Sequence, residues 1–419
     1  MLDRTIPPPF NRSSSFDLHH PEKKILSNGI SLCLVPGGSQ DVIKIELVFS
    51  AGRWVEQPWG ASYFASQLLS KGTANKDSFE IAQIFDTLGA HLEINPGLDF
   101  VSISLYSLTR NLEPALSLLL EILTGATLPE KELEQLKSIY LQNLEVNSEK
   151  TSFLASKLFR KNLFGEAHPY GKELDTEDVK NLSRANLLEH MEKLRHGLTV
   201  FVSGKIDEKS KSLLHTLLAT VPAKAGEISH IPVKSERAVN QHQEKEGSVQ
   251  ASIRMGKKSV IRSHPDYVDV LFLNHILGGY FGSRLMKNIR EEKGLTYGIH
   301  ASLHALRHEG YLVIGADVNK ENISLTINEI RKEIRRLREE AVDANELETA
   351  QSHFIGSLQS ELTTSFAHAE KIKTITLFGL PDNYYNQMIA RIARLNANDL
   401  IKTAGQHFTE DSFLEIAVG

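Results

Sequence analysis

The chemistry open to this sequence depends first on three polar side chains in the stretch GASYFASQLLSKGT, residues 60–73. Tyr63, Ser66 and Gln67 occupy positions i, i+3 and i+4, which lie on one face of a helix. Positions i and i+4 can bind one metal ion when both carry histidine, and a neighbouring glutamate can act as general base. Tyrosine and glutamine are poor metal ligands and serine is no base at neutral pH, so this face has the spacing of a metal site without its chemistry.

A second candidate pair is Arg290 and Tyr297, seven residues apart within LGGYFGSRLMKNIREEKGLTYGI. A guanidinium and a phenol both donate hydrogen bonds to a polarised carbonyl or an oxyanion. We expect Arg290 near the end of a helix over Ser283–Lys293, which Gly294 ends, and Tyr297 on the strand that follows. The spacing alone leaves open that Arg290 is an ordinary surface arginine and Tyr297 a tyrosine of the core.

The histidines do not predict a metal site elsewhere. His300, His304 and His308 are spaced by four, but they fall on a predicted strand and turn where only one carboxylate, Glu309, is near. We expect these three to lie on the surface or on an edge strand. His19, next to His20, belongs to an N-terminal arm with three consecutive prolines, which predicts an extended segment with solvated side chains.

Composition limits the class of protein. The 419 residues are 41% hydrophobic and 24% charged with a net charge of −5, an ordinary globular balance without a basic surface for nucleic acid or membranes. No apolar run approaches the roughly 18 residues of a membrane span. The single cysteine, Cys33, lies in an apolar run and cannot form an internal disulfide, so we expect a buried thiol in a reducing compartment. A cytoplasmic protein is predicted.

The chain repeats itself. Residues 132–165 and 346–379 both begin Glu-Leu-Glu and end Leu-Phe-Gly, at an offset of 214 residues. Further along, the run LTVFVSG that ends at Gly204 matches FLEIAVG, which ends at Gly419. Agreement over about 75 residues indicates an internal duplication.

The order of predicted elements supports two copies of one α+β domain. We place an N-terminal domain at 1–220, a polar, proline-bearing linker at 221–247 and a C-terminal domain at 248–419. Two similar domains joined by a long linker favour a ligand site between them. Alternation and helical spacing predict strands at 43–49, 90–94 and 100–106 with helices at 60–70, 79–88 and 112–123, then strands at 250–255, 297–303 and 310–318 with helices at 267–277, 283–293 and 323–337.

These motifs carry a resemblance to a known family. The stretch at 60–73 resembles the signature helix of the M16 (pitrilysin, mitochondrial-processing-peptidase-like) zinc metallopeptidases, Gly-x-x-His-x-x-Glu-His followed by Lys-Gly-Thr. Residues 277–299 are similar to the family's C-terminal arginine and tyrosine motif, and with the lead-in SAGRWVEQPWG and the repeat the resemblance covers nearly the whole chain. It implies two LuxS/MPP-like metallohydrolase domains, each a mostly antiparallel sheet packed with helices, facing each other across a cleft.

The resemblance also implies which residues stand at the family's functional positions. Tyr63 replaces the first histidine, Ser66 the catalytic glutamate and Gln67 the second histidine, while Asn143, 76 residues after Gln67, replaces the distal glutamate. With all four replaced, we expect no catalytic residue and no metal in this chain. Arg290 and Tyr297 are kept, and in the family such a pair holds backbone carbonyls of the substrate.

The leading hypothesis is a non-catalytic subunit, inactive alone, that binds extended peptides or unfolded polypeptide. It would supply Arg290 and Tyr297 to a zinc-bearing M16 partner with an intact His-x-x-Glu-His, so zinc is expected only in the partner. A heterodimer is expected, and a homodimer stays possible. Two alternatives remain open: a structural scaffold without a proteolytic role, and a peptidase with a displaced metal.

Overall fold

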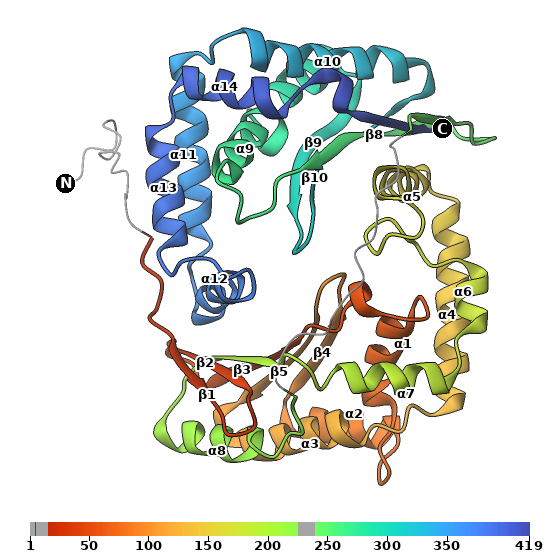
Figure 1. The fold of residues 1–419 in the computed structure, drawn as a ribbon, viewed down its shortest axis with the longest axis vertical. Helices are drawn as coiled ribbons and strands as arrows, with labels where there is room; N and C mark the ends of the chain where they lie inside the picture. Colours follow the sequence, from red (N-terminus) through yellow and green to blue (C-terminus); the bar gives the residue numbers. More distant parts are fainter. Residues whose placement is uncertain (1–4, 6–15, 225–238) are drawn as a thin grey trace.

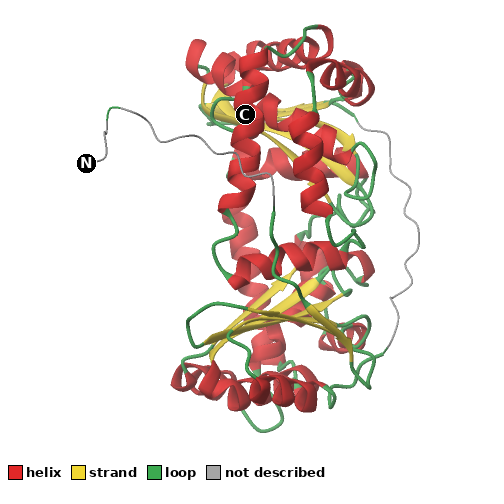
Figure 2. Ribbon diagram, turned by 90° about the vertical axis from the view of Figure 1, so that its left-hand side faces the viewer, coloured by secondary structure: helices red, strands yellow, loops and turns green. Residues whose placement is uncertain are grey.

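The computed structural model describes residue 5 and residues 16–224 and 239–419. Two sheets lie one above the other, with helices outside them and further helices between them (Figure 2). The three prolines of the N-terminal arm fall outside the described residues. No described helix is both long and apolar enough to cross a membrane.

The N-terminal lobe is built on a six-stranded sheet in the order β1-β2-β6-β3-β5-β4. Its neighbours pair antiparallel except for β2 and β6, which are parallel. The strands are β1 (Glu22–Ile25), β2 (Ser31–Pro36), β3 (Val42–Phe49), β4 (His91–Pro96), β5 (Val101–Leu108) and β6 (Thr199–Gly204). The helices before the second sheet are α1 (Ala61–Leu68), α2 (Ser78–Leu88), α3 (Leu112–Gly125), α4 (Glu130–Ser148), α5 (Thr151–Phe164), α6 (Thr176–Asn181), α7 (Arg184–Lys193) and α8 (Glu208–Leu218).

The C-terminal lobe is built on a five-stranded sheet in the order β7-β11-β8-β10-β9, in which only β7 and β11 pair parallel. Its strands are β7 (Gln241–Gln243), β8 (Gln250–Ser259), β9 (Thr296–Ala305), β10 (Gly310–Asn319) and β11 (Leu414–Val418). Its helices are α9 (Tyr267–Asn274), α10 (Ile323–Glu339), α11 (Ala344–Ser360), α12 (Ser365–Leu377), α13 (Tyr384–Arg394) and α14 (Ala397–His407), with π-helical turns η4 (His275–Gly279) and η5 (Met286–Glu292).

The predicted fold class is confirmed: both lobes are α+β, with mixed sheets that are mostly antiparallel. Every strand and helix predicted from periodicity is found, with small shifts at the ends. Two differ in kind, because the predicted helix at 267–277 ends in η4 and most of the one at 283–293 winds as η5. Part of the predicted linker, 241–243, forms β7 on the second sheet, and the division of the chain at 221–247 stays a prediction.

The two lobes exchange helices. α5 follows the N-terminal sheet in the sequence but packs on β8 and β11 of the other lobe, where Phe159 and Leu163 join the buried Ile416 (Figure 1). α12 makes the reciprocal crossing, since its Ile372 packs against Phe201 on the first sheet. Burying apolar surface across the lobe boundary makes each lobe part of the other's core.

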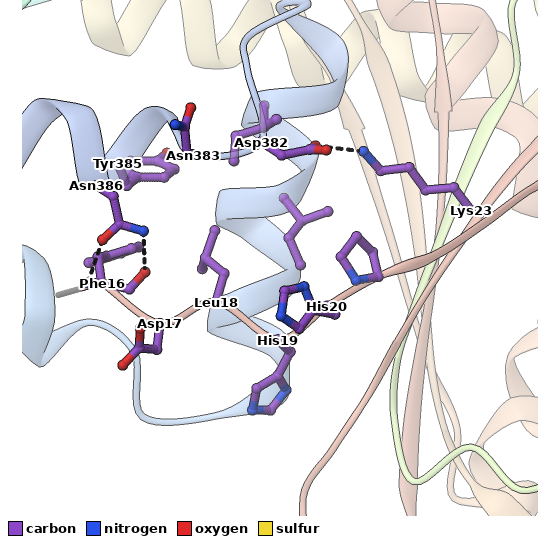
Figure 3. Close-up of a pocket in the computed structure, with 13 residues that line it drawn as sticks. Phe16, Asp17, Leu18, His19, His20, Lys23, Asp382, Asn383, Tyr385 and Asn386 are labelled. Atoms are coloured by element: carbon purple, nitrogen blue, oxygen red, sulfur yellow. Dashed lines mark hydrogen bonds and ion pairs between the residues drawn. The ribbon is translucent and has the colours of Figure 1, made fainter.

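An N-terminal segment, residues 16–23, forms a further connection between the lobes. Phe16 is buried in the core of the C-terminal lobe, 5.0 Å ring to ring from Tyr385. Asn386 accepts a hydrogen bond from the backbone nitrogen of Phe16 at 2.8 Å and donates one to its carbonyl at 3.1 Å (Figure 3). The segment then joins β1, and a cavity of about 620 Å³ lies between it and α12 and α13.

The histidines of this segment differ from one another. His20 is exposed, as expected, whereas His19 is half-buried, because its ring stacks on His368 of α12 at 3.9 Å between centroids. Cys33 is buried as expected, and burial raises the pKa of its thiol to about 11, so it is not a reactive thiolate.

Candidate functional site

The helix that carries the candidate metal positions is α1. Gly60 precedes it at φ 91°, in the left-handed region, and the carboxylate of Glu56 accepts a hydrogen bond from the backbone nitrogen of Ser62 at 3.0 Å. One face is apolar and fully buried, which explains why a short helix is stable here. The residues of that face are Ala61, Phe64, Ala65 and Leu68.

The opposite face of α1 is closed by aromatic packing. The ring of Tyr63 meets the ring of Tyr140 on α4, with centroids 5.3 Å apart and planes at 65°. Burial raises the pKa of both phenols, so neither becomes the phenolate that a metal would need. Tyr140 stands one turn before Asn143, which is exposed on the same helix.

Ser66 and Gln67, the other two candidate metal-site positions on α1, are also engaged in the packing of the fold. Ser66 is fully buried rather than placed on an open polar face, and its hydroxyl has no hydrogen-bond partner among the described residues. Gln67 donates from Nε2 to the carbonyl of Ile94 at 3.2 Å. Ile94 lies on β4, the edge strand of the N-terminal sheet, so Gln67 ties α1 to that edge.

Metal-binding geometry is missing from the described part of the chain. No group of three or more histidine, cysteine, aspartate or glutamate side chains is suitably placed there. Of the spaced histidines, His304 stacks on Tyr311 at 4.5 Å and His308 on Trp54 at 4.2 Å, so both rings serve packing. His300 lies exposed on β9, an edge strand as expected.

The second candidate pair is brought together. The guanidinium of Arg290, on η5, lies 5.3 Å from the ring centroid of Tyr297 on β9 and 4.8 Å from that of Phe281. Both rings are largely open to solvent: Tyr297 is 92% exposed and Phe281 62%. Two aromatic rings therefore hold Arg290, and its side chain has no carboxylate or hydrogen-bond partner among the described residues.

Glycines make this geometry possible. Gly294, at φ 62°, ends η5 and reverses the chain, so that Tyr297 returns beside Arg290. At Gly278 a Cβ atom would lie 2.8 Å from the backbone nitrogen of Ala301, so only glycine lets η4 lie this close to β9. The turn that carries Phe281 is thereby fixed against the strand that carries Tyr297.

Two aromatic residues of these sites were not predicted. Phe281 lies inside the motif at 277–299. The sequence shows it only as an aromatic residue in a glycine-rich turn, and such a residue is equally well explained as part of the core. Tyr140 aligns with Phe354 in the internal repeat, which indicates an aromatic position but not its partner.

Comparisons with known proteins cover most of the chain. A family model described as insulinase (peptidase family M16) matches residues 37–168, and one described as peptidase M16 inactive domain matches residues 181–354. The break between the two matches falls shortly after α5.

Relatives and a solved structure agree with these matches. An uncharacterized zinc protease, YmxG of Bacillus subtilis strain 168, is 24% identical over 396 residues, covering 93% of this chain and 96% of the relative. A non-peptidase homolog YmxG of Helicobacter pylori is 24% identical over 359 residues, covering 82% and 81%. The crystal structure of a peptidase M16 inactive domain from Pseudomonas fluorescens superposes with a TM-score of 0.87 at 23% identity, covering 95% of this chain and 98% of that one.

Proposed function

The chain belongs to the peptidase M16 family, and we propose that it is a non-catalytic member that binds extended peptides beside Arg290 and Tyr297. In this proposal a partner subunit with an intact His-x-x-Glu-His supplies the zinc, and this chain supplies the arginine and tyrosine that hold the substrate. One observation carries the proposal: Arg290 stands between two exposed aromatic rings with its hydrogen-bond donors unengaged.

The state of α1 supports the non-catalytic half of the proposal. Zinc peptidase chemistry needs imidazole or carboxylate ligands and a base that takes a proton from the metal-bound water. Tyr63 is packed on Tyr140, Ser66 is buried and Gln67 is bonded to β4. A chain built this way depends on a partner for any bond cleavage.

The chemistry of the Arg290 group supports the binding half. A guanidinium presents five donors in a planar fork, and a phenol adds one more. Carbonyl oxygens of an extended peptide are suitable acceptors, and aromatic rings beside them offer contact to apolar side chains. Tyr297 and Phe281 supply those rings, and their exposure leaves room for a ligand.

The sheet edges offer a second element of recognition. β9, which carries Tyr297, and β4, which contacts α1, each have a neighbouring strand on one side only among the described strands. An extended peptide can add to such an edge through backbone hydrogen bonds. Gln67 already occupies the carbonyl of Ile94 on β4, so we favour β9 as the edge that receives the peptide.

The relatives are consistent with a division of labour. One is named a zinc protease and another a non-peptidase homolog, so proteins of this length and similarity carry both descriptions. We propose a cytoplasmic location, supported by the lone buried thiol of Cys33.

The test mixes the purified chain with an M16 subunit from the same organism that carries the intact His-x-x-Glu-His, and follows cleavage of a fluorogenic peptide. We expect the mixture to cleave at least about tenfold faster than the partner alone, and Arg290→Ala to remove most of that gain. Arg394→Ala, at the exposed end of α13, is the matched control and keeps the gain. A mixture no faster than the partner alone contradicts the proposal.

Peptide binding separates the proposal from a scaffold role. In a direct titration with a labelled extended peptide, the proposed function requires binding that weakens with Arg290→Ala. A scaffold shows no binding and tolerates the substitution.

A further inference from the structure

A second, smaller cavity lies where the lobes meet. It has a volume of about 360 Å³, is open to solvent, and is lined by three separate segments: the loop after β8, the turn between β9 and β10, and the C-terminal end of α12. α12 is the helix that crosses to the N-terminal sheet (Figure 1). Phe378 in the cavity wall packs against Phe100 of the first lobe, with ring centroids 6.5 Å apart, so both lobes support the cavity.

The cavity is basic. Arg262 and Arg307 both line it, and none of the eight described residues in its wall is acidic. The protein as a whole carries a net charge of −5, so two arginines in one small cavity are a local reversal of sign.

Aromatic rings and a hydroxyl hold Arg262 in place. Its guanidinium lies 5.3 Å from the ring of Phe378 and 5.7 Å from that of Tyr267, and it donates to the hydroxyl of Tyr267 at 3.1 Å. No described carboxylate forms an ion pair with Arg262, and its Nε is buried without a partner. Arg262 is half-buried, and a partly buried cation without a described counter-ion favours an anionic ligand.

Arg307 is positioned from the other lobe. Its guanidinium lies 5.2 Å from the ring of Phe100 and donates to the hydroxyl of Ser50 at 3.3 Å. Its backbone nitrogen donates to Asp99 at 3.0 Å, a carboxylate that also accepts the hydroxyl of Tyr170 and does not line the cavity. The turn that carries Arg307 is thus anchored to the first lobe by groups that do not line the cavity.

The wall contains one more unmatched polar group. The hydroxyl of Thr376 is buried and has no hydrogen-bond partner among the described residues. Buried polar groups in folded proteins are nearly always paired, so unpaired ones at a cavity wall point to a ligand or ordered water.

From these observations we propose that this cavity is a binding site for a small oxyanion, a carboxylate or a phosphate. Two guanidinium groups suit such a ligand because their planar donors match its oxygens in pairs. A volume of about 360 Å³ accommodates a terminal carboxylate with its last residue or a free phosphate. If the carboxylate comes from a bound peptide, the site rests on the proposed function and directs it toward peptide C-termini.

The experiment titrates the purified chain by calorimetry with three small probes: inorganic phosphate, N-acetylglycine and N-acetylglycinamide. The last two differ in the carboxylate alone. We expect phosphate or N-acetylglycine to bind and the amide not to bind. Arg262→Gln and, independently, Arg307→Gln weaken binding about tenfold, while Arg394→Gln leaves it unchanged.

The three probes distinguish the possible sources of the anion. Binding of N-acetylglycine indicates a peptide terminus, and binding of phosphate alone indicates a free anion. No binding of either anion, or equal binding by wild type and both cavity variants, overturns the site. These probes need neither a partner subunit nor Arg290, so the result is independent of the proposed peptidase role.

Discussion

Tyr63 on α1 and Tyr140 on α4 pack edge to face, with ring centroids 5.3 Å apart, over the face of α1 that the resemblance predicts as the metal position. Aromatic packing therefore covers this face of α1. Packed aromatic pairs stabilise a fold beyond the area they bury, so this contact now contributes to stability.

Substituting the family's histidines and glutamates at these positions should reveal the stability that the aromatic packing contributes. We expect zinc to leave the urea midpoint of the wild type unchanged. The variant Tyr63→His, Ser66→Glu, Gln67→His, Asn143→Glu should be several kcal/mol less stable without metal, because a glutamate at the fully buried position 66 is a desolvated carboxylate. Added zinc should recover part of that loss. Stoichiometric zinc in the purified wild type would contradict the prediction.

Phe281 should contribute to peptide binding through its contact with Arg290. Phe281→Ala removes one of the two rings that hold the guanidinium in place, so Arg290 must be ordered when the peptide binds. Ordering such a side chain costs about 0.5–1 kcal/mol, and affinity should fall about two- to fivefold. Fluorescence anisotropy of a labelled peptide measures the change. Phe79→Ala, which removes a ring that is 71% exposed on α2, is the control, and an equal effect of both variants would show that Phe281 has no specific role.

The exchanged helix α5 should matter for stability more than an ordinary surface helix. Phe159 is 2% exposed and packs between the lobes, so Phe159→Ala should cost about 3–5 kcal/mol in the free energy of unfolding. Phe79→Ala should stay within about 0.5 kcal/mol. Urea denaturation compares the two, and a Phe159→Ala variant as stable as the control would mean that α5 does not bind the lobes together.

Local pattern and non-local packing explain what the sequence could and could not predict. The α3 stripe of Leu112, Leu116 and Leu119 fixes a helix because the period is local, and each of these residues is buried. The exchange of α5 and α12 was not predicted, since periodicity shows that Phe159 is buried but not against which sheet. The close approach of Gly278 in η4 to Ala301 on β9 joins residues far apart in the sequence, so no local pattern encodes it.

The candidate site likewise contains residues that the sequence could identify and packing partners that it could not. Spacing and resemblance selected Tyr63, Ser66, Gln67, Arg290 and Tyr297, and the structure places the first three on α1 and the last two in contact. The aromatic partners were missed because a ring in the sequence indicates burial before it indicates a particular neighbour.

The stability of the protein should fall in mild acid because of His190. This side chain is fully buried on α7, within hydrogen-bonding distance of the carbonyl of Ala51 at 3.0 Å, and burial lowers its pKa to about 4. In the unfolded chain the pKa is about 6.5. The native state therefore binds fewer protons than the unfolded state between these values.

The direction of this pH effect follows from the linkage between proton binding and unfolding. Above about pH 6.5 His190 is neutral in both states and its effect is constant, whereas between pH 6.5 and 4 the free energy of unfolding falls by about 1.4 kcal/mol per pH unit. His190→Gln, whose amide can still donate to Ala51, should reduce the slope by about one proton. Urea unfolding at pH 7, 6 and 5 measures the slope, and His20→Gln, at the exposed histidine of the N-terminal segment, is the control. An unchanged slope in His190→Gln would mean that other groups, such as the buried His275, whose pKa is also lowered to about 4, dominate the acid response.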